Sequence, residues 1–222
     1  MAKRIGKRTV ILDKKIIFKG YGSVVGKHEY EGPLGAEFDS YDMDCRFGEE
    51  SYEKAESRLQ KIAVQNALKR AGCNEREIDC VFAGDLLNQC IGSFFGLREM
   101  EIPLVGLYGA CSTMTLSLIM AANLIESGAA KRTVAVTSSH FCSAERQYRF
   151  PLEYGSQRTP TAQRTVTGSG ASILEEGENK PYINAFTIGK IVDLGVTDAN
   201  NMGAAMAPDD VKIRPYPMGV GG

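Results

Sequence analysis

Residues 112–126 predict a helix that carries small or apolar side chains on nearly every face. Such a helix has to be covered on more than one side, because a surface helix keeps a polar face toward water. A β-type run at 102–108 precedes this helix, and another at 133–137 follows it. Strand, buried helix and strand in that order predict a layered α/β fold with right-handed crossovers onto a largely parallel sheet.

A second helix is expected over residues 51–71, where apolar residues recur at three- and four-residue spacing. Lys69 and Arg70 near its end agree with the helix dipole, and Gly72 behind them is suited to a C-terminal cap. The run 78–83 then predicts a short buried strand, so helices and strands alternate through this part of the chain.

The remaining segments are less regular. Residues 7–48 predict a strand followed by a long glycine-rich loop, and residues 141–165 lack periodicity, which is typical of a functional loop. The runs 166–174 and 182–192 predict two further strands that are candidates for a hairpin.

Composition excludes several classes of function. With 26 basic and 27 acidic residues the formal net charge is -1, so no overall field attracts nucleic acid or an anionic bilayer. No run approaches the roughly 20 apolar residues of a membrane helix. The first apolar stretch is interrupted by Asp13, Lys14 and Lys15, whereas a signal peptide needs an uninterrupted apolar region. The sequence therefore predicts a cytosolic protein.

The six cysteines include no C-x-x-C pair, and His28 and His140 are the two histidines. Zinc-type spacing is absent, so we expect no metal or other cofactor and mostly buried free thiols.

Cys111 lies in the turn Gly109–Ala110–Cys111–Ser112–Thr113, between the predicted strand and the apolar helix. Its sulfur would face the helix N-terminus, where unpaired amides and the dipole lower a thiol pKa. Acyl-transfer enzymes present nucleophiles on such elbows. A lone cysteine there is more often structural, so the turn alone leaves both roles open.

Several short motifs accompany this turn: AGDLLNQ at 83–89, TSSH at 137–140, AERQ at 144–147, EYG at 153–155 and VTGSGA at 166–171. Together with the cysteine turn they resemble the stage V sporulation protein AD family, from about Gly32 to Pro208. The resemblance implies that residues 1–208 form the first, N-terminal half of a thiolase-like fold. The composition of the end of the chain, which is rich in Gly and Pro, predicts a loose tail over 209–222.

The resemblance also implies a function. Its members would bind dipicolinic acid, or its calcium salt, for uptake into the developing spore, without demonstrated catalysis. Implied partners are other stage V sporulation A proteins at the spore membrane and a second copy of the chain, in a location peripheral to the inner spore membrane. The implied ligand-binding residues are Asp85, Cys111, Ser112, His140, Glu145 and Arg146.

The residues themselves leave alternatives open for these positions. Arginines 146, 149, 158 and 164 alternate with aromatic residues, which suits a flat aromatic dicarboxylate and equally suits a dimer interface. His140 is either a carboxylate partner or a histidine satisfied at a strand end. Asp85 either faces the pocket or caps the next turn.

An enzymatic alternative remains. Condensing enzymes take their catalytic histidine and oxyanion donors from the second half of the fold, and no histidine follows His140 here. If the protein is an enzyme, we expect an acyltransferase that accepts an acyl group on Cys111. One half of the fold alone would leave apolar faces of its sheet and helix uncovered.

Overall fold

A computed structural model describes residues 2–148, 164–195 and 197 of the chain. Contacts divide the chain into two units, residues 1–156 with 164–187 and residues 157–163 with 188–222. All the helices and strands below belong to the first unit. The described residues of the second unit, 188–195 and 197, carry no regular secondary structure.

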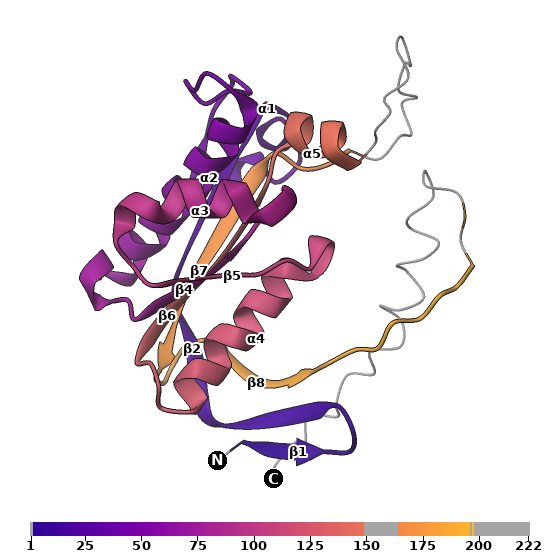
Figure 1. Ribbon diagram of the computed structural model, residues 1–222. Helices are drawn as coiled ribbons and strands as arrows, with labels where there is room; N and C mark the ends of the chain where they lie inside the picture. Colours follow the sequence, from indigo (N-terminus) through magenta and orange to yellow (C-terminus); the bar gives the residue numbers. More distant parts are fainter. Residues whose placement is uncertain (1, 149–163, 196, 198–222) are drawn as a thin grey trace. The chain divides into compact units, whose positions relative to one another are not determined.

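One eight-stranded sheet runs through the middle of the first unit (Figure 1). Strands β3 (Ser40–Tyr41) and β8 (Tyr182–Thr187) both pair with β2. The others follow the order β1 (Lys3–Ile5), β2 (Thr9–Val25), β7 (Gly168–Glu176), β6 (Arg132–Ser139), β4 (Cys80–Gly84) and β5 (Leu104–Gly106).

The expected largely parallel sheet is wrong. Strand β2 pairs antiparallel with β1, β7 and β8, and β6 pairs antiparallel with β7, whereas β4–β5, β4–β6 and β2–β3 are parallel. The reason is that β7 lies between β2 and β6 and runs against both. Apolar runs identify strands, but they do not reveal which strands become neighbours.

The candidate hairpin of β7 and β8 does not form either. Both strands pair with β2, and Ile16 of β2 faces Glu176 of β7 and Ile183 of β8. A long strand of 17 residues has room for several partners, and the register shift between Ile11 and Ile16 marks a bulge in the pairing with β8.

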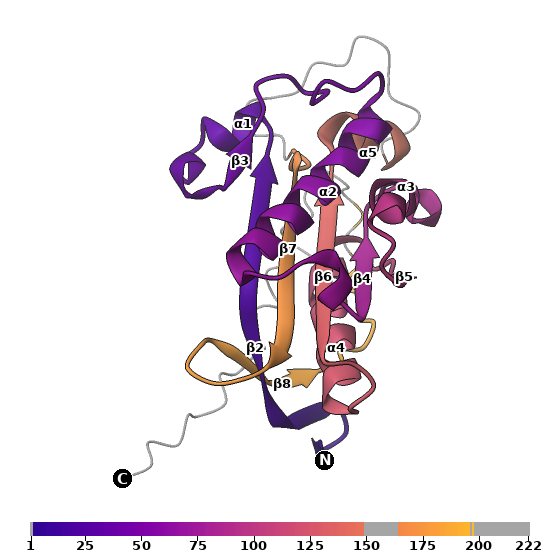
Figure 2. The ribbon, with the colours of Figure 1, turned by 90° about the vertical axis from the view of Figure 1, so that its left-hand side faces the viewer.

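Helix α2 (Tyr52–Ala71) confirms the prediction over 51–71. The Ser51 hydroxyl caps its first turn by accepting from the Lys54 amide, and Gly72 ends it at φ 68°. The helix crosses one face of the sheet (Figure 2). An added Cβ at Gly22 of β2 would lie 2.4 Å from the Ala63 carbonyl oxygen, so glycine permits this close approach.

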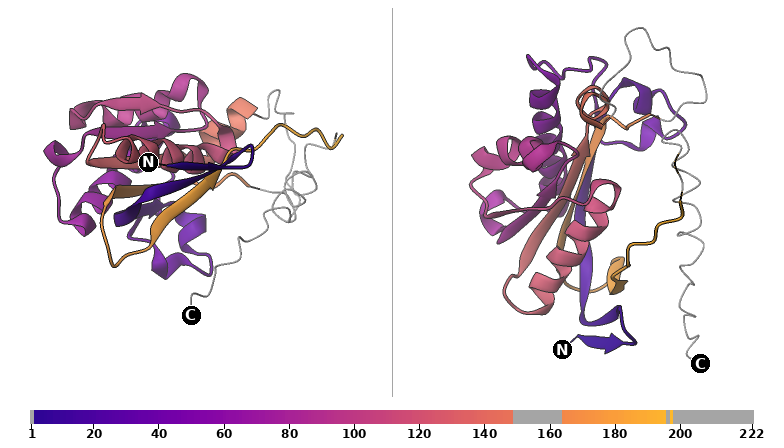
Figure 3. Two further views of the ribbon diagram at one scale, coloured as in Figure 1. Left: turned by 90° about the horizontal axis from the view of Figure 1, so that it is seen from below. Right: turned by 45° about the vertical axis from the view of Figure 1, so that its right-hand side comes forward.

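Helix α3 (Ile91–Leu97) packs beside α2 on the same face, and α4 (Thr113–Glu126) covers the opposite face (Figure 3). Ala121, Ala122 and Ile125 of α4 are buried in a cluster with residues of the sheet. The expectation of burial on every face is wrong, because the sheet covers one side of α4 and Met120 is 39% exposed. The apolar residues on the side of α4 that faces away from the sheet are partly exposed.

The segment 7–48 was expected to be one strand and a loop. It contains the whole of β2, followed by α1 (Lys27–Tyr30), a 3-10 turn at Gly35–Glu37 and β3. The expected loop 141–165 begins instead as helix α5 (Phe141–Tyr148). The rest of that loop at 149–163 and the predicted tail 209–222 lie outside the described residues.

All six cysteines are free thiols, but Cys80 and Cys90 alone among them are buried, and Cys45 and Cys111 are exposed. The expectation of mostly buried thiols is therefore wrong. Within the described ranges, no helix combines the length and the apolar character needed to span a bilayer.

Candidate functional site at the ends of β4, β5 and β6

The cysteine elbow forms as predicted. A 3-10 turn over Ala110–Ser112 leads directly into α4, and Ala110 has a φ of 46°, which is uncommon for a residue with a side chain. Thr113 holds the turn, because its hydroxyl donates to the Ala110 carbonyl at 2.8 Å and accepts from the Gly109 amide at 3.0 Å. Cys111 and Ser112 are left exposed at the start of the helix.

Gly84, the last residue of β4, lets the elbow approach. A Cβ at this position would lie 2.2 Å from the Leu107 carbonyl oxygen and 2.4 Å from the Thr113 methyl carbon. The thiol of Cys90 lies 3.3 Å from the same Leu107 oxygen. The segment that follows β4 is therefore packed directly beside the elbow that follows β5.

Asp85 comes next and is 1% exposed. Its carboxylate accepts hydrogen bonds from the Leu87 amide at 2.9 Å, the Ser93 amide at 2.7 Å and the Ser93 hydroxyl at 2.6 Å. These bonds close the connection to α3, in which Gln89 and Cys90 adopt positive φ values of 63° and 53°. The geometry matches the turn-holding alternative for Asp85.

A buried polar network behind Asp85 was not predicted from the sequence. Glu56 and Gln60 of α2 are fully buried. Glu56 accepts from the Ser138 and Ser143 hydroxyls, each at 3.0 Å. The Gln60 amide nitrogen lies 2.9 Å from the hydroxyls of both Ser93 and Ser138 and 3.0 Å from the Gly84 carbonyl. The network thus ties α2 and α3 to the ends of β4 and β6.

Glu56 and Asp85 bring two carboxyls into this network without a cation. A Cβ added at Gly92 would lie 3.3 Å from the Asp85 carboxyl carbon and 3.4 Å from Cγ of Glu56, so the two side chains are neighbours. Within the described residues neither forms an ion pair. Burial, with the nearby charge of Asp85, raises the pKa of Glu56 to about 7.

The signal for these two residues was available in the helix pattern. Glu56 and Gln60 stand one turn apart and lead into Ala63 and Ala67, so they occupy the face that α2 buries. Polar residues at core positions of an amphipathic helix are costly unless they are hydrogen-bonded, and they often mark a functional or specific role.

His140, at the end of β6, is fully buried with both ring nitrogens engaged. Nε2 lies 2.6 Å from the Cys45 carbonyl oxygen and therefore donates, while Nδ1 accepts from the Cys142 amide at 3.2 Å. The ring centroid is 5.2 Å from that of Tyr52. Burial lowers the pKa of His140, which keeps the imidazole neutral. The satisfied strand-end alternative fits this geometry.

The last two predicted residues lie beyond His140. Glu145 is 7% exposed and accepts from the Thr165 hydroxyl at 3.0 Å. The side chain of Arg146 lies outside the described residues, as do residues 149 and 158. Arg164, the remaining arginine of the predicted loop, stacks over the Phe141 ring at 4.4 Å.

A cavity of about 30 Å³ adjoins His140, Cys45 and Arg164. This volume holds a single water, whereas small-molecule sites usually measure several hundred Å³. Among the described residues, no group of three or more His, Cys, Asp or Glu side chains could bind a metal ion.

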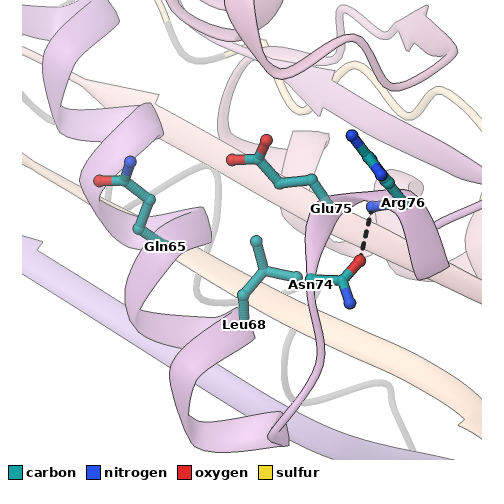
Figure 4. Close-up of a pocket in the computed structure, with 5 residues that line it drawn as sticks. All are labelled: Gln65, Leu68, Asn74, Glu75 and Arg76. Atoms are coloured by element: carbon teal, nitrogen blue, oxygen red, sulfur yellow. Dashed lines mark hydrogen bonds between the residues drawn. The ribbon is translucent and has the colours of Figure 1, made fainter.

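A larger depression of about 510 Å³ lies between α2 and the 3-10 turn Glu75–Glu77 (Figure 4). It is an open surface feature, lined by Gln65, Leu68, Asn74, Glu75 and Arg76, in which the Arg76 amide donates to the Asn74 side chain at 3.0 Å. The turn directly precedes β4, so the depression sits at the end of the strand away from Asp85. It is not the candidate site.

Comparison with known proteins decides the family. The stage V sporulation protein AD family matches residues 6–214 of the chain. The chain belongs to this family. It is 41% identical over 206 residues to stage V sporulation protein AD of Bacillus subtilis (strain 168), an alignment that covers 93% of this chain and 61% of that relative. The chain thus spans less than two thirds of the relative's length.

Solved structures show the fold of this family member. The priming β-ketosynthase of the R1128 polyketide pathway matches with a TM-score of 0.50 at 18% identity, covering 80% of this chain and 53% of that one. OleA of Xanthomonas campestris, in complex with cerulenin, matches with a TM-score of 0.51 at 11% identity, covering 74% and 58%. The chain therefore resembles part of the condensing-enzyme fold, as the sequence predicted.

Proposed function

We propose that this family member binds dipicolinic acid, free or as its calcium salt, for uptake into the developing spore. The observation that carries the proposal is the family match, which extends over residues 6–214. The resemblance that identified the family also implies this ligand. Binding without chemistry suits the described geometry, since both nitrogens of His140 are engaged elsewhere and it is not free to act as a base.

The geometry suggests different roles for the predicted ligand-binding residues. Cys111 and Ser112 are exposed at the N-terminus of a 14-residue helix, where the positive end of the helix dipole favours a carboxylate. Arg146 is proposed as a charged partner for a carboxylate. Asp85, His140 and Glu145 are buried and hydrogen-bonded, so in this proposal they shape the site from behind.

A calorimetric titration of the 222-residue chain with dipicolinic acid tests the proposal. Benzoate, isophthalate and acetyl-coenzyme A serve as comparison ligands, because they carry one carboxylate, two carboxylates on a benzene ring, or a thioester. We expect saturable heat with dipicolinate and little with the others. A cooperatively folded sample that gives no heat with dipicolinate would contradict the proposal for this chain.

A matched pair of variants locates the site. Ser112→Ala removes a hydroxyl at the start of α4, and Ser127→Ala removes one just past its end, where the Ser127 hydroxyl donates to the Leu124 carbonyl. The proposal expects weaker dipicolinate binding in the first variant and unchanged binding in the second. Equal effects would place the ligand elsewhere.

A second candidate is an acyltransferase of the condensing type. The specific observation in its favour is the exposed Cys111 on a strained elbow, with Ala110 at φ 46°. In this reaction the Cys111 thiolate attacks the carbonyl of an acyl thioester and the carrier thiolate leaves. Mass spectrometry after incubation with acetyl-coenzyme A should then show an acetyl group on Cys111 and none on the equally exposed Cys45.

The partners implied by the family are also proposals. A second copy of the chain could extend the sheet at β5, which ends the strand order and has Phe94, Phe95 and Val105 exposed nearby. Light scattering on the purified chain, alone and as Phe95→Glu, would test a homodimer at this edge. We also propose that the chain contacts other stage V sporulation A proteins at the spore membrane. The chain itself would then lie peripheral to the inner spore membrane.

A further inference from the structure

We propose that Glu56 is a proton switch that regulates the same site by exchanging the Ser143 hydroxyl between itself and the His140 carbonyl. Ser143 lies 3.0 Å from a Glu56 carboxyl oxygen and 3.2 Å from the His140 carbonyl oxygen. A hydroxyl has one hydrogen to donate, so it can serve one of these two acceptors at a time.

The proton of the switch belongs on Glu56. The neighbouring Asp85 carboxyl accepts hydrogen bonds from two amides and one hydroxyl at 2.6–2.9 Å. The Glu56 carboxyl accepts longer hydrogen bonds from two hydroxyls, each at 3.0 Å, and it also accepts one from the Leu86 amide. Burial, with the nearby charge of Asp85, raises the pKa of Glu56 to about 7, so Glu56 holds a proton over part of the neutral range.

The rearrangement follows from the hydrogen-bond capacity of each group. Ionised Glu56 accepts from Ser143. Protonated Glu56 donates to the Ser143 oxygen, and the Ser143 hydrogen then turns to the His140 carbonyl, which already accepts from the Ala144 amide. The proton on Glu56 therefore adds a hydrogen bond at the first turn of α5, where β6 ends.

The groups around Glu56 come from several elements packed against α2. Asp85, at the end of β4, is the titratable one, and burial raises the pKa of the Cys90 thiol beside it. The ring of His140 is turned to Cys45 and Tyr52. The hydroxyls of the network come from α3, β6 and α5, namely Ser93, Ser138 and Ser143.

The consequence for the site rests on the proposed function. An anionic ligand at the ends of β4 and β5 is opposed by a second buried negative charge, so protonation of Glu56 should strengthen its binding. By linkage, the ligand should raise the proton affinity of Glu56 and the chain should take up a proton on binding.

The ligand-free experiment is an NMR titration of side-chain carboxyl carbons in the 222-residue chain labelled at glutamate. Glu56→Gln identifies the resonance. Glu50, which is exposed and lies just before the first residue of α2, provides the reference at the same end of the helix. We expect Glu56 to titrate near neutrality, whereas the hydrogen bond from Lys54 keeps the pKa of Glu50 below its ordinary acidic value. A Glu56 midpoint equal to that of Glu50 would overturn the switch.

The ligand experiment is calorimetry of dipicolinate binding at about pH 6 and about pH 8, in two buffers with different ionisation enthalpies. We expect affinity to be about three- to tenfold higher at the lower pH, with proton uptake on binding, because the ligand carboxyls stay ionised throughout. Glu56→Gln should abolish both effects, whereas Glu50→Gln should abolish neither.

Ser143→Ala removes the switching hydroxyl and retains the acid. It should keep a near-neutral midpoint for Glu56. In the wild type we expect the NMR shift of the Ala144 amide, which donates to the same His140 carbonyl, to change with pH, and this change should disappear in the variant. Wild-type binding that is equal at both pH values would refute regulation by this proton. Absence of dipicolinate binding at any pH would refute the proposed function, and the carboxyl titration would still decide whether Glu56 is the switch.

Discussion

The turns after β5 and β4 lie side by side, yet they hold their functional groups in opposite ways. Cys111 and Ser112 after β5 are exposed, and Ala110 beside them has a positive φ. Asp85 after β4 is 1% exposed and accepts three hydrogen bonds. The turn after β5 is therefore accessible from solvent, whereas the hydrogen bonds of the turn after β4 hold the connection to α3 in position.

The largest effect should come from filling the contact between the two turns. Gly84→Ala would place a Cβ within 2.4 Å of both Leu107 and Thr113, so strand or elbow has to move. We expect a loss of at least about 3 kcal/mol in the free energy of unfolding, measured with urea.

Gly170→Ala is the matched control, because a Cβ at Gly170 on β7 meets nothing within 4 Å. It should change stability by less than about 0.5 kcal/mol. Similar losses in both variants would show that the elbow does not rest on β4 as closely as described.

The pH dependence of stability tests the buried carboxyl of Glu56, which lies behind the turn after β4. The pKa of Glu56 is raised from 4.5 to about 7, so folded protein binds this proton more tightly than unfolded protein between those values. The contribution of Glu56 to the free energy of unfolding is therefore greatest at acid pH. It falls by roughly 3 kcal/mol at most as pH rises toward 7 and is constant above that pH.

His140 works in the opposite direction, since burial lowers its pKa and its contribution is lost as pH falls. The difference between wild type and Glu56→Gln, measured by urea unfolding from about pH 5 to about pH 8, cancels the histidine. We expect the variant to gain relative stability as pH rises. A constant difference across this range would contradict a raised pKa for Glu56.

Asp85→Asn should have a smaller effect, of about 2 kcal/mol. The new amide group cannot accept from all three donors that now meet the carboxylate, while the volume of the side chain is unchanged. Thermal unfolding monitored by circular dichroism measures the loss. Stability equal to wild type would mean that these donors find other acceptors and that Asp85 does not hold the turn.

The smallest effect is expected at the open turn. Cys111→Ala should alter stability by less than about 0.5 kcal/mol, because the side chain is exposed. Alkylation with iodoacetamide should modify Cys111 and Cys45, both exposed, and spare the buried Cys80 and Cys90. Faster labelling of Cys111 than of Cys45 would reveal activation by the start of α4, and equal rates would argue against it.

The local elements could be predicted from short stretches of the sequence. Ser51 and Gly72 mark the two ends of α2 because their side-chain and backbone preferences act within one turn. The Gly109–Thr113 elbow formed where small residues precede the apolar run. Short motifs were also enough to indicate the family, which the match over residues 6–214 confirmed.

Which strands and side chains become neighbours depends on packing between distant segments. Strand β7 enters between β2 and β6 and makes the sheet mixed, and the sheet leaves one side of α4 partly open. Packing also brings Glu56 next to Asp85, although the two are 29 positions apart in the sequence, because α2 lies over the end of β4. Periodicity reports which face of an element is buried, and packing alone determines what that face meets.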